Sequence, residues 1–162
     1  MKSFKNILFI CKGIVLISIL AIMISTFSSP KDSQVDFDTV WNTMVANVDL
    51  SNLEERDNQG IKRFLSLDPD TYESIRYYKS IDDMKADEIV LVKFKSHADQ
   101  ETFKSTLTTH ISEQEDIFAG YAPDEEQLLE DSVLYVQANY GLFVFNTNAQ
   151  TICNQFLSGI EG

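Results

Sequence analysis

The sequence has few of the residues that build the familiar cofactor and metal sites. Its 162 residues include two cysteines, two histidines and six glycines. These counts exclude a disulfide framework and a zinc site built from cysteine and histidine. Three glycines, Gly13, Gly159 and Gly162, lie in an apolar run or near the C-terminus, so few remain for a phosphate-binding loop. We therefore predict no metal and no cofactor.

Basic residues are also scarce, and their distribution is uneven. The net charge of −12 argues against nucleic-acid binding, which needs a basic surface. The first 29 residues hold three lysines and no acidic residue, so the remaining 133 carry 10 basic and 25 acidic side chains, a net charge of −15. With 44% hydrophobic and 11% aromatic residues, that acidic part can build the core of one domain.

The basic start precedes an apolar run, as in a membrane-directed segment. Counted over 7–27, the run would be about 31 Å long as a helix, enough to span a bilayer as a signal anchor, with Lys12 reaching the interface. Counted over 13–27, it would measure about 22 Å, which fits a cleaved secretory signal. Both readings place the following domain outside the cell. The expected organisation is a signal anchor or signal peptide (1–29), a linker (30–35) and a domain (36–160).

Hydrophobic periodicity predicts an α+β fold for the acidic part. We expect a mainly antiparallel four-stranded sheet, with a long helix on one face, two N-terminal helices and an N-terminal membrane helix. Asp36 and Asp38 are candidate caps for the first domain helix, Ser51 with Glu54 for the second, and Asp99 for the long helix. The predicted helices are 37–49, 53–66, 100–118, 124–131 and 149–158, and the predicted strands are 72–79, 88–95, 133–138 and 142–147.

Several short motifs in this part occur in a characteristic order. EIVLVKFK (88–95) is followed by a long helix containing Gln114, by FAGY (118–121) with Gln127, and by a hairpin that ends in LFVF (142–145). NQGIKRFLSLD (58–68) precedes them. In this order the motifs resemble the bacterial domain of unknown function DUF4358 over most of 36–158.

The resemblance implies an exported, membrane-attached protein of Gram-positive bacteria without an assigned activity. Members are often lipoproteins, which need a cysteine after the apolar run to carry the lipid. No cysteine follows the run here, so residues 7–27 themselves would attach the protein to the membrane. Where the family usually has arginine, four residues before Gln114, this chain has His110. The resemblance also implies an association with membrane-bound O-acyltransferases, whose genes often neighbour those of the family.

Four polar residues are candidates for a pocket or for a structural polar cluster: His110, Gln114, Tyr121 and Gln127. His110 and Gln114 are one helical turn apart beside an apolar stripe, where buried polar groups normally find partners. Glu88 opens the strongest strand, next to Asp87, and a paired carboxylate can serve acid–base chemistry.

Two further features are assigned structural roles. Cys153 lies on the apolar stripe of the last helix and is predicted to be a buried thiol. The acidic pairs 36/38, 68/70 and 82/83 lack the spacing of a calcium loop. No residue is predicted to be catalytic.

Three functional hypotheses follow. The first is a non-catalytic, membrane-anchored extracytoplasmic module that binds a protein or an envelope component. The second, which rests on the resemblance, is an accessory subunit of an envelope-modifying enzyme such as a membrane-bound O-acyltransferase. The third is a hydrolase or transferase that uses His110 with an acid.

Overall fold

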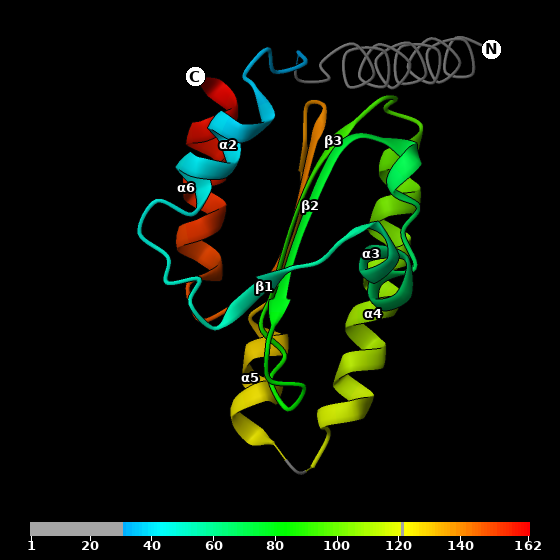
Figure 1. Cartoon of the computed structure of the whole chain (residues 1–162), viewed down its shortest axis with the longest axis vertical. Helices are drawn as coiled ribbons and strands as arrows, with labels where there is room; N and C mark the ends of the chain where they lie inside the picture. The colour runs from blue at the N-terminus through cyan, green and yellow to red at the C-terminus, as the bar shows by residue number, and fades with distance from the viewer. Residues whose placement is uncertain (1–30, 121) are drawn as a thin grey trace, which may run out of the picture. The chain divides into compact units, whose positions relative to one another are not determined.

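A computed structural model describes residues 31–120 and 122–162. They form one antiparallel sheet of five strands in the order β1-β2-β3-β5-β4 (Figure 1). The strands are β1 (Leu53–Glu55), β2 (Tyr72–Ser80), β3 (Glu88–Phe94), β4 (Val133–Gln137) and β5 (Tyr140–Phe145). The helices are α2 (Phe37–Met44), α3 (Asn58–Leu65), α4 (Asp99–Phe118), α5 (Pro123–Glu130) and α6 (Ala149–Glu161), with a short 3-10 helix at Pro69–Thr71.

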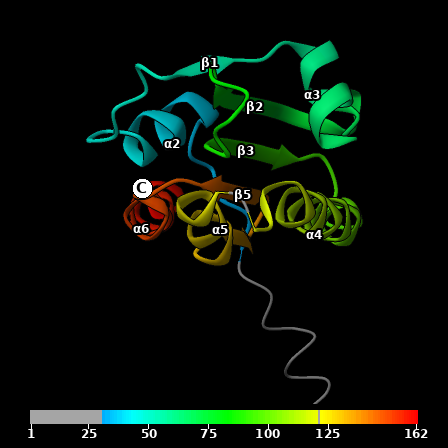
Figure 2. The same ribbon diagram turned by 90° about the horizontal axis from the view of Figure 1, so that it is seen from below.

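Helices cover both faces of the sheet. Figure 2 shows α2 and α6 on one side of the strands and α3 and α4 on the other. The central strand β3 is buried at every position except Lys93, and all of β5 is buried. This explains why the predicted strand 88–95 is almost entirely apolar at its start, since a strand covered on two faces has no polar side.

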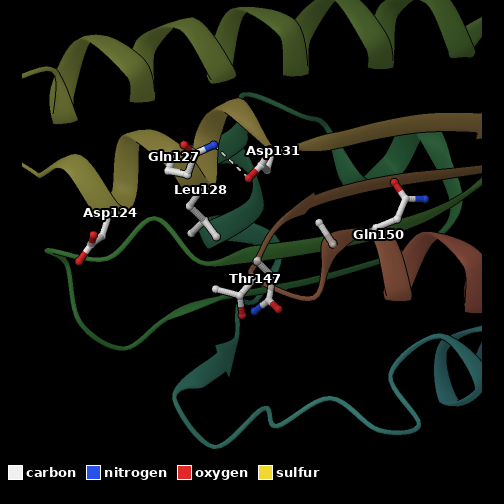
Figure 3. A pocket seen from close by; sticks show the side chains of 8 residues that line it. Asp124, Gln127, Leu128, Asp131, Thr147 and Gln150 are labelled. Atoms are coloured by element: carbon white, nitrogen blue, oxygen red, sulfur yellow. Dashed lines mark hydrogen bonds between the residues drawn. The ribbon is translucent and has the colours of Figure 1, made fainter.

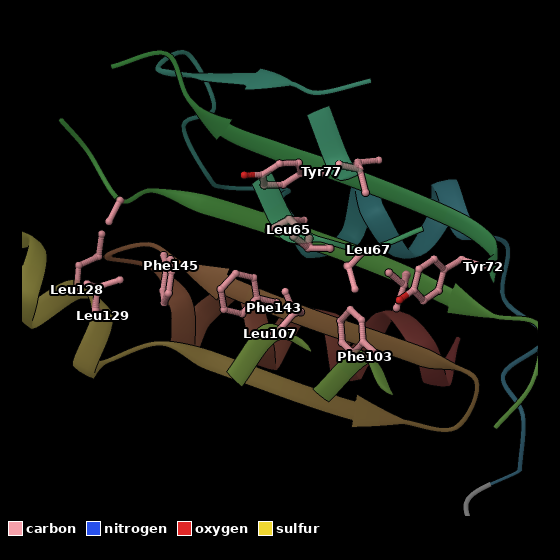
Figure 4. Close-up of a cluster of buried hydrophobic side chains, with 14 of the residues drawn as sticks. Leu65, Leu67, Tyr72, Tyr77, Phe103, Leu107, Leu128, Leu129, Phe143 and Phe145 are labelled. Atoms are coloured by element: carbon pink, nitrogen blue, oxygen red, sulfur yellow. The ribbon is translucent and has the colours of Figure 1, made fainter. Parts of the chain in front are cut away.

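Each face has its own hydrophobic core. On the α3 and α4 face, Phe103 and Leu107 from α4 pack on Phe143 and Phe145 from β5 (Figure 4). On the other face, α2 and α6 pack on Ile89, Leu91 and their neighbours in the sheet. Alternate residues of one strand therefore stabilise two separate cores.

The predicted α+β class is confirmed, but the sheet has five strands rather than four and is covered on both faces. The predicted helix 53–66 is wrong at its start. Its first residues, Leu53–Glu55, are the edge strand β1, which pairs with β2. The helix α3 begins at Asn58, and the side chain of Asp57, rather than Ser51, caps it by accepting a hydrogen bond from Gly60 N at 2.8 Å.

Other boundaries differ by a few residues. Asp36 caps α2 as predicted, but that helix ends at Met44 rather than 49. Asp99 is the first residue of α4 and does not cap it, because the N-cap position is Ala98. The predicted hairpin between the last two strands is present, and its turn is Ala138-Asn139, where Ala138 has a φ of 54°.

The start of the domain is tied to the sheet end where β4 and β5 meet. Ser33 N donates to Asn139 Oδ1 at 2.9 Å, Ser33 Oγ donates to the Ile160 carbonyl at 2.6 Å, and Tyr140 Oη donates to the Val35 carbonyl at 2.8 Å. Residues 33–35, expected in a linker, thus contact the domain.

The predicted membrane segment, residues 7–27, lies outside the described residues. Among the helices of 31–120 and 122–162, none combines the length and the apolar character needed to cross a bilayer.

Candidate functional site

Three of the four residues of the predicted polar cluster are described, and His110 and Gln127 lie on different helices with different hydrogen-bond partners. His110 is buried under the sheet, and Gln114 is half-buried one turn further along α4. Gln127 is exposed on α5, where its Nε2 donates to Asp131 Oδ2 at 3.1 Å. Tyr121 lies outside the described residues. His110 and Gln127 therefore lie in separate environments of the domain.

His110 contacts the carboxylate that the sequence singled out. Its Nε2 lies 2.9 Å from Glu88 Oε2, in a pair that is 6% and 0% exposed. The other oxygen, Glu88 Oε1, accepts a hydrogen bond from Lys79 Nζ at 2.6 Å. Lys79 and Glu88 face each other across β2 and β3, so the sheet register itself brings them together. Both carboxylate oxygens are thereby used inside the protein.

Aromatic and cationic groups close this network. The hydroxyl of Tyr77 lies near Glu88, and burial, followed by the Glu88 charge, raises the pKa of Tyr77. Phe64 covers the outer side, with its ring centroid 5.8 Å from Lys79 Nζ and 5.7 Å from the Arg56 guanidinium. A depression of about 240 Å³ between α3 and α4 reaches His110. It does not expose Glu88, so a substrate in it would meet at most an edge of the imidazole, and the network fits a structural role better than acid–base catalysis.

An open concave surface lies at one end of the sheet, beside α5. Two adjoining cavities, here called the end cavities, have volumes of about 380 Å³ and about 500 Å³. Both are bordered by Asp124, Leu128 and Thr147. Figure 3 shows the smaller one, with Asp124, Gln127 and Asp131 of the α5 region facing Thr147 and Gln150. The larger one extends to Asn52 and to the loop between β2 and β3.

Side-chain bridges fix the walls of the end cavities. Glu125, which is 6% exposed, accepts hydrogen bonds from Ala86 N at 2.9 Å and from Lys85 Nζ at 2.7 Å. This holds the β2–β3 loop against α5. Asn146 donates from Nδ2 to Asp87 Oδ1 at 3.0 Å and accepts from Asn148 N at 2.8 Å, which joins β3 to the start of α6.

The end cavities are acidic. Their lining includes five carboxylates, Asp82, Asp87, Asp124, Glu125 and Asp131, and one cation, Lys85. Burial, followed by the neighbouring Glu125 charge, raises the pKa of Asp87, although the hydrogen bond from Asn146 opposes this. No group of three potential metal-ligating side chains suited to hold an ion occurs within the described residues. The lining therefore favours a cationic or hydrogen-bonding ligand and offers no activated nucleophile.

Cys153, the acidic pairs and the second histidine, His97, have structural contacts. Cys153 is buried as predicted, and burial raises the pKa of its thiol. Asp36 caps α2, and Asp68 caps the 3-10 helix and pairs with Lys62 Nζ at 2.9 Å. His97 lies in an exposed pair with Asp32, with 2.8 Å between Nε2 and Oδ1.

Among the residues that line the end cavities, the sequence had singled out Gln127 as a pocket candidate and Asp82 and Asp87 as acidic residues, but it indicated neither the rest of the lining nor Lys79. Lys79 lies at the end of a predicted strand, and only the register of β2 against β3 shows that it faces Glu88. Asn146 and Thr147 gave a usable signal, because they break the apolar run LFVF with polar residues directly before a helix.

Comparison with known protein families shows which family the chain belongs to. The model of a domain of unknown function, DUF4358, matches residues 46–146, which is more than half of the chain. The chain belongs to the DUF4358 family. The match covers every strand and the helices α3, α4 and α5, so the end cavities and the Glu88 network are both built largely from the DUF4358 region. No curated protein and no solved structure matches the chain.

Proposed function

We propose that this DUF4358 protein is a non-catalytic binding module of the bacterial cell envelope, anchored in the membrane through residues 7–27 with its acidic domain outside. One observation carries the binding role. The domain's acidic, hydrogen-bonding groups border open cavities of about 380 and 500 Å³, whereas its carboxylate–histidine pair is enclosed. Binding at the end cavities therefore has accessible chemistry, and catalysis by His110 and Glu88 does not.

The position of the end cavities suits an anchored module. The two ends of β3 mark two different regions of the domain. Asp87 directly precedes β3 and borders the end cavities. His97 follows the other end of β3 and pairs with Asp32, at the start of the domain. At about 3.3 Å per residue, the seven residues of β3 separate the two ends by roughly 20 Å. A chain held at Asp32 would thus offer the end cavities at the far end of the sheet.

Site-specific photo-crosslinking in intact cells tests this function. A photoreactive residue replaces Thr147, at the rim of the end cavities, in the full chain expressed in a Gram-positive host. The matched control replaces Thr102, which is also an exposed threonine and lies near the start of α4, on the Asp32 side of the sheet. We expect a discrete crosslinked product from position 147 only. Equal products from both positions, or none from either, would contradict the proposal.

Two further readouts separate the remaining alternatives. Mass spectrometry of the product identifies the partner, and a membrane-bound O-acyltransferase there would make the module an accessory subunit of that enzyme. Mass spectrometry of the membrane-fraction protein is expected to show an intact N-terminus. A chain that begins near Ser29 would indicate a cleaved signal and a secreted domain instead.

A further inference from the structure

The two edges of the sheet differ in how they are protected against strand pairing. β1 has only three residues, and two of them are the charged Glu54 and Glu55. β4 has five residues, VLYVQ, with no charge, no proline and no bulge in its register with β5. Short length and charge are common devices that keep an edge strand from pairing with other chains. The β1 edge has them and the β4 edge lacks them.

The register shows which backbone groups of β4 face outward. Phe94 N donates to the Asn139 carbonyl, so residue 139 and every second residue after it in β5 bond toward β3. Tyr140, Leu142 and Val144 therefore bond toward β4, to Gln137, Tyr135 and Val133. The remaining two residues of β4, Leu134 and Val136, point their N–H and C=O groups away from the sheet.

From Ser132 to Ala138, every second residue points its backbone groups outward. The two end residues of this segment form hydrogen bonds with other parts of the domain. The Ala138 carbonyl accepts Gln100 Nε2 at 2.6 Å, and Ser132 N donates to the Leu129 carbonyl at 3.1 Å. For Leu134 and Val136, no backbone or side-chain hydrogen bond joins these outward groups to any other described residue. Both side chains are half-buried and pack on the core of the α3 and α4 face, so the strand is held in place while its outward backbone groups have no hydrogen bond within 31–120 and 122–162.

We propose that the free edge of β4 receives an extended, basic segment of another protein as a sixth strand. An extended backbone is required because four outward amide groups, two donors and two acceptors, are spaced for strand addition. Basic residues are favoured because Glu130 and Asp131 lie three and two residues before the first residue of the strand, Val133, and the part of the chain after residue 29 carries a charge of −15. A second copy would bring the same negative charge to the edge. The inference concerns a surface distinct from the end cavities and does not rest on the function proposed for them.

Amide hydrogen exchange of the full chain in detergent micelles tests the proposal, with the synthetic peptide KKVTVTVKK as the probe. Without peptide, the amides of Leu134 and Val136 should exchange rapidly, while those of Val133, Tyr135 and Gln137 exchange slowly. With saturating KKVTVTVKK, exchange at Leu134 and Val136 should slow by about tenfold or more. EEVTVTVEE and the proline peptide KKVTPTVKK should give no such protection.

A proline substitution provides the matched control pair. Val136→Pro removes an outward N–H but no bond to β5, so the fold is kept and peptide protection at Leu134 is lost. Val136→Ile keeps the N–H and should retain protection. If Val136→Pro proves unfolded by circular dichroism, the unmodified chain with the three peptides still decides the question.

Three outcomes would overturn the proposal. Equal protection by the acidic or the proline peptide would remove the charge or the strand requirement. Slow exchange of Leu134 and Val136 before peptide is added would mean that another part of this chain or a second copy already covers the edge, and sedimentation would distinguish those two. Protection of the β1 amides by KKVTVTVKK to the same extent would remove the difference between the edges.

Discussion

Removal of the buried Glu88 carboxylate should be among the most destabilising changes in the domain. Glu88→Leu leaves the Lys79 ammonium, whose side chain is only 11% exposed, without its 2.6 Å partner, and it leaves His110 Nε2 unbonded. Removing one partner of a buried ion pair typically costs about 3–5 kcal/mol, because the other charge stays desolvated. That is a large part of the roughly 5–15 kcal/mol that stabilises an ordinary domain.

The double substitution should recover much of this loss. In the double variant Glu88→Leu with Lys79→Met, no ammonium is left buried opposite leucine. The loss of unfolding free energy in the double variant should therefore be smaller than the sum of the losses in the two single variants. We expect a coupling free energy of about 2 kcal/mol or more between the two positions. The matched control is the pair Lys104–Glu101, at 2.9 Å, whose side chains are 44% and 83% exposed. Its coupling should stay below about 1 kcal/mol.

Equilibrium unfolding in urea measures these free energies. Trp41 is the single tryptophan of the chain and is 5% exposed against Tyr78, so its fluorescence reports the loss of the α2 and α6 packing. The measurement uses the compact unit Asp32–Gly162, which contains both cores. A cost below about 1 kcal/mol for Glu88→Leu, or strictly additive effects of the two substitutions, would refute the reasoning, since it would mean that the Lys79 ammonium stays hydrated.

Three further changes test other parts of the structure. Gly141→Ala would place a Cβ 2.8 Å from Phe103 Cε1 in the core, so a loss of about 1–3 kcal/mol is expected in the same urea assay, and an unchanged midpoint would count against this packing. The raised pKa of Asp87 means that the folded state holds its proton above the ordinary value of 3.8, so its carboxylate opposes folding as the pH rises. Asp87→Asn should therefore melt higher than the original chain at pH 7 but not near pH 3, and an equal difference at both values would exclude titration as the cause. Asp57→Ala removes the cap on Gly60 N and should cost about 1 kcal/mol, whereas Asp57→Asn should cost much less.

The elements that could be predicted from the sequence are those whose own pattern determines them. β3 is a nearly continuous apolar strand, and α6 repeats apolar residues at helical spacing. Both were placed within a few residues because their burial follows from local periodicity. The hairpin was predicted from the residues Asn139-Tyr140-Gly141 between two alternating segments, but its turn falls at Ala138-Asn139.

The fifth strand could not be predicted in this way. β1 is three residues long, and its pairing with Tyr78–Ser80 of β2 is the contact that makes it a strand. Ser51 and Glu54 have the spacing of a helix cap, which locally predicts a helix. Leu53–Glu55 form a strand instead, because they hydrogen-bond to β2, more than twenty residues away in the sequence. Which helices cover which face could not be predicted, because the pattern of a helix does not say which face of a sheet it packs on.

The candidate sites depend on sheet register even more strongly. Lys79 and Glu88 pair because the turn between β2 and β3 places them opposite each other, and a shift of either strand by one residue would put the two side chains on opposite faces of the sheet. The end cavities combine α5, the β2–β3 loop and the start of α6. No single stretch of sequence contains enough of either site to reveal it.

The same register explains why the accessible chemistry of the domain lies at its margins. The groups best suited to acid–base work, Glu88 and His110, are used within the core, where they join β3 to α4. Hydrogen-bonding capacity remains at the end cavities and along Leu134 and Val136. These surfaces adjoin, because Asp131 borders the smaller cavity and β4 begins only two residues later at Val133. A strand added along β4 therefore runs toward the acidic lining of that cavity. If both proposals hold, one basic partner segment would bond to the outward backbone groups of β4 and also place a cation among the carboxylates of the cavity.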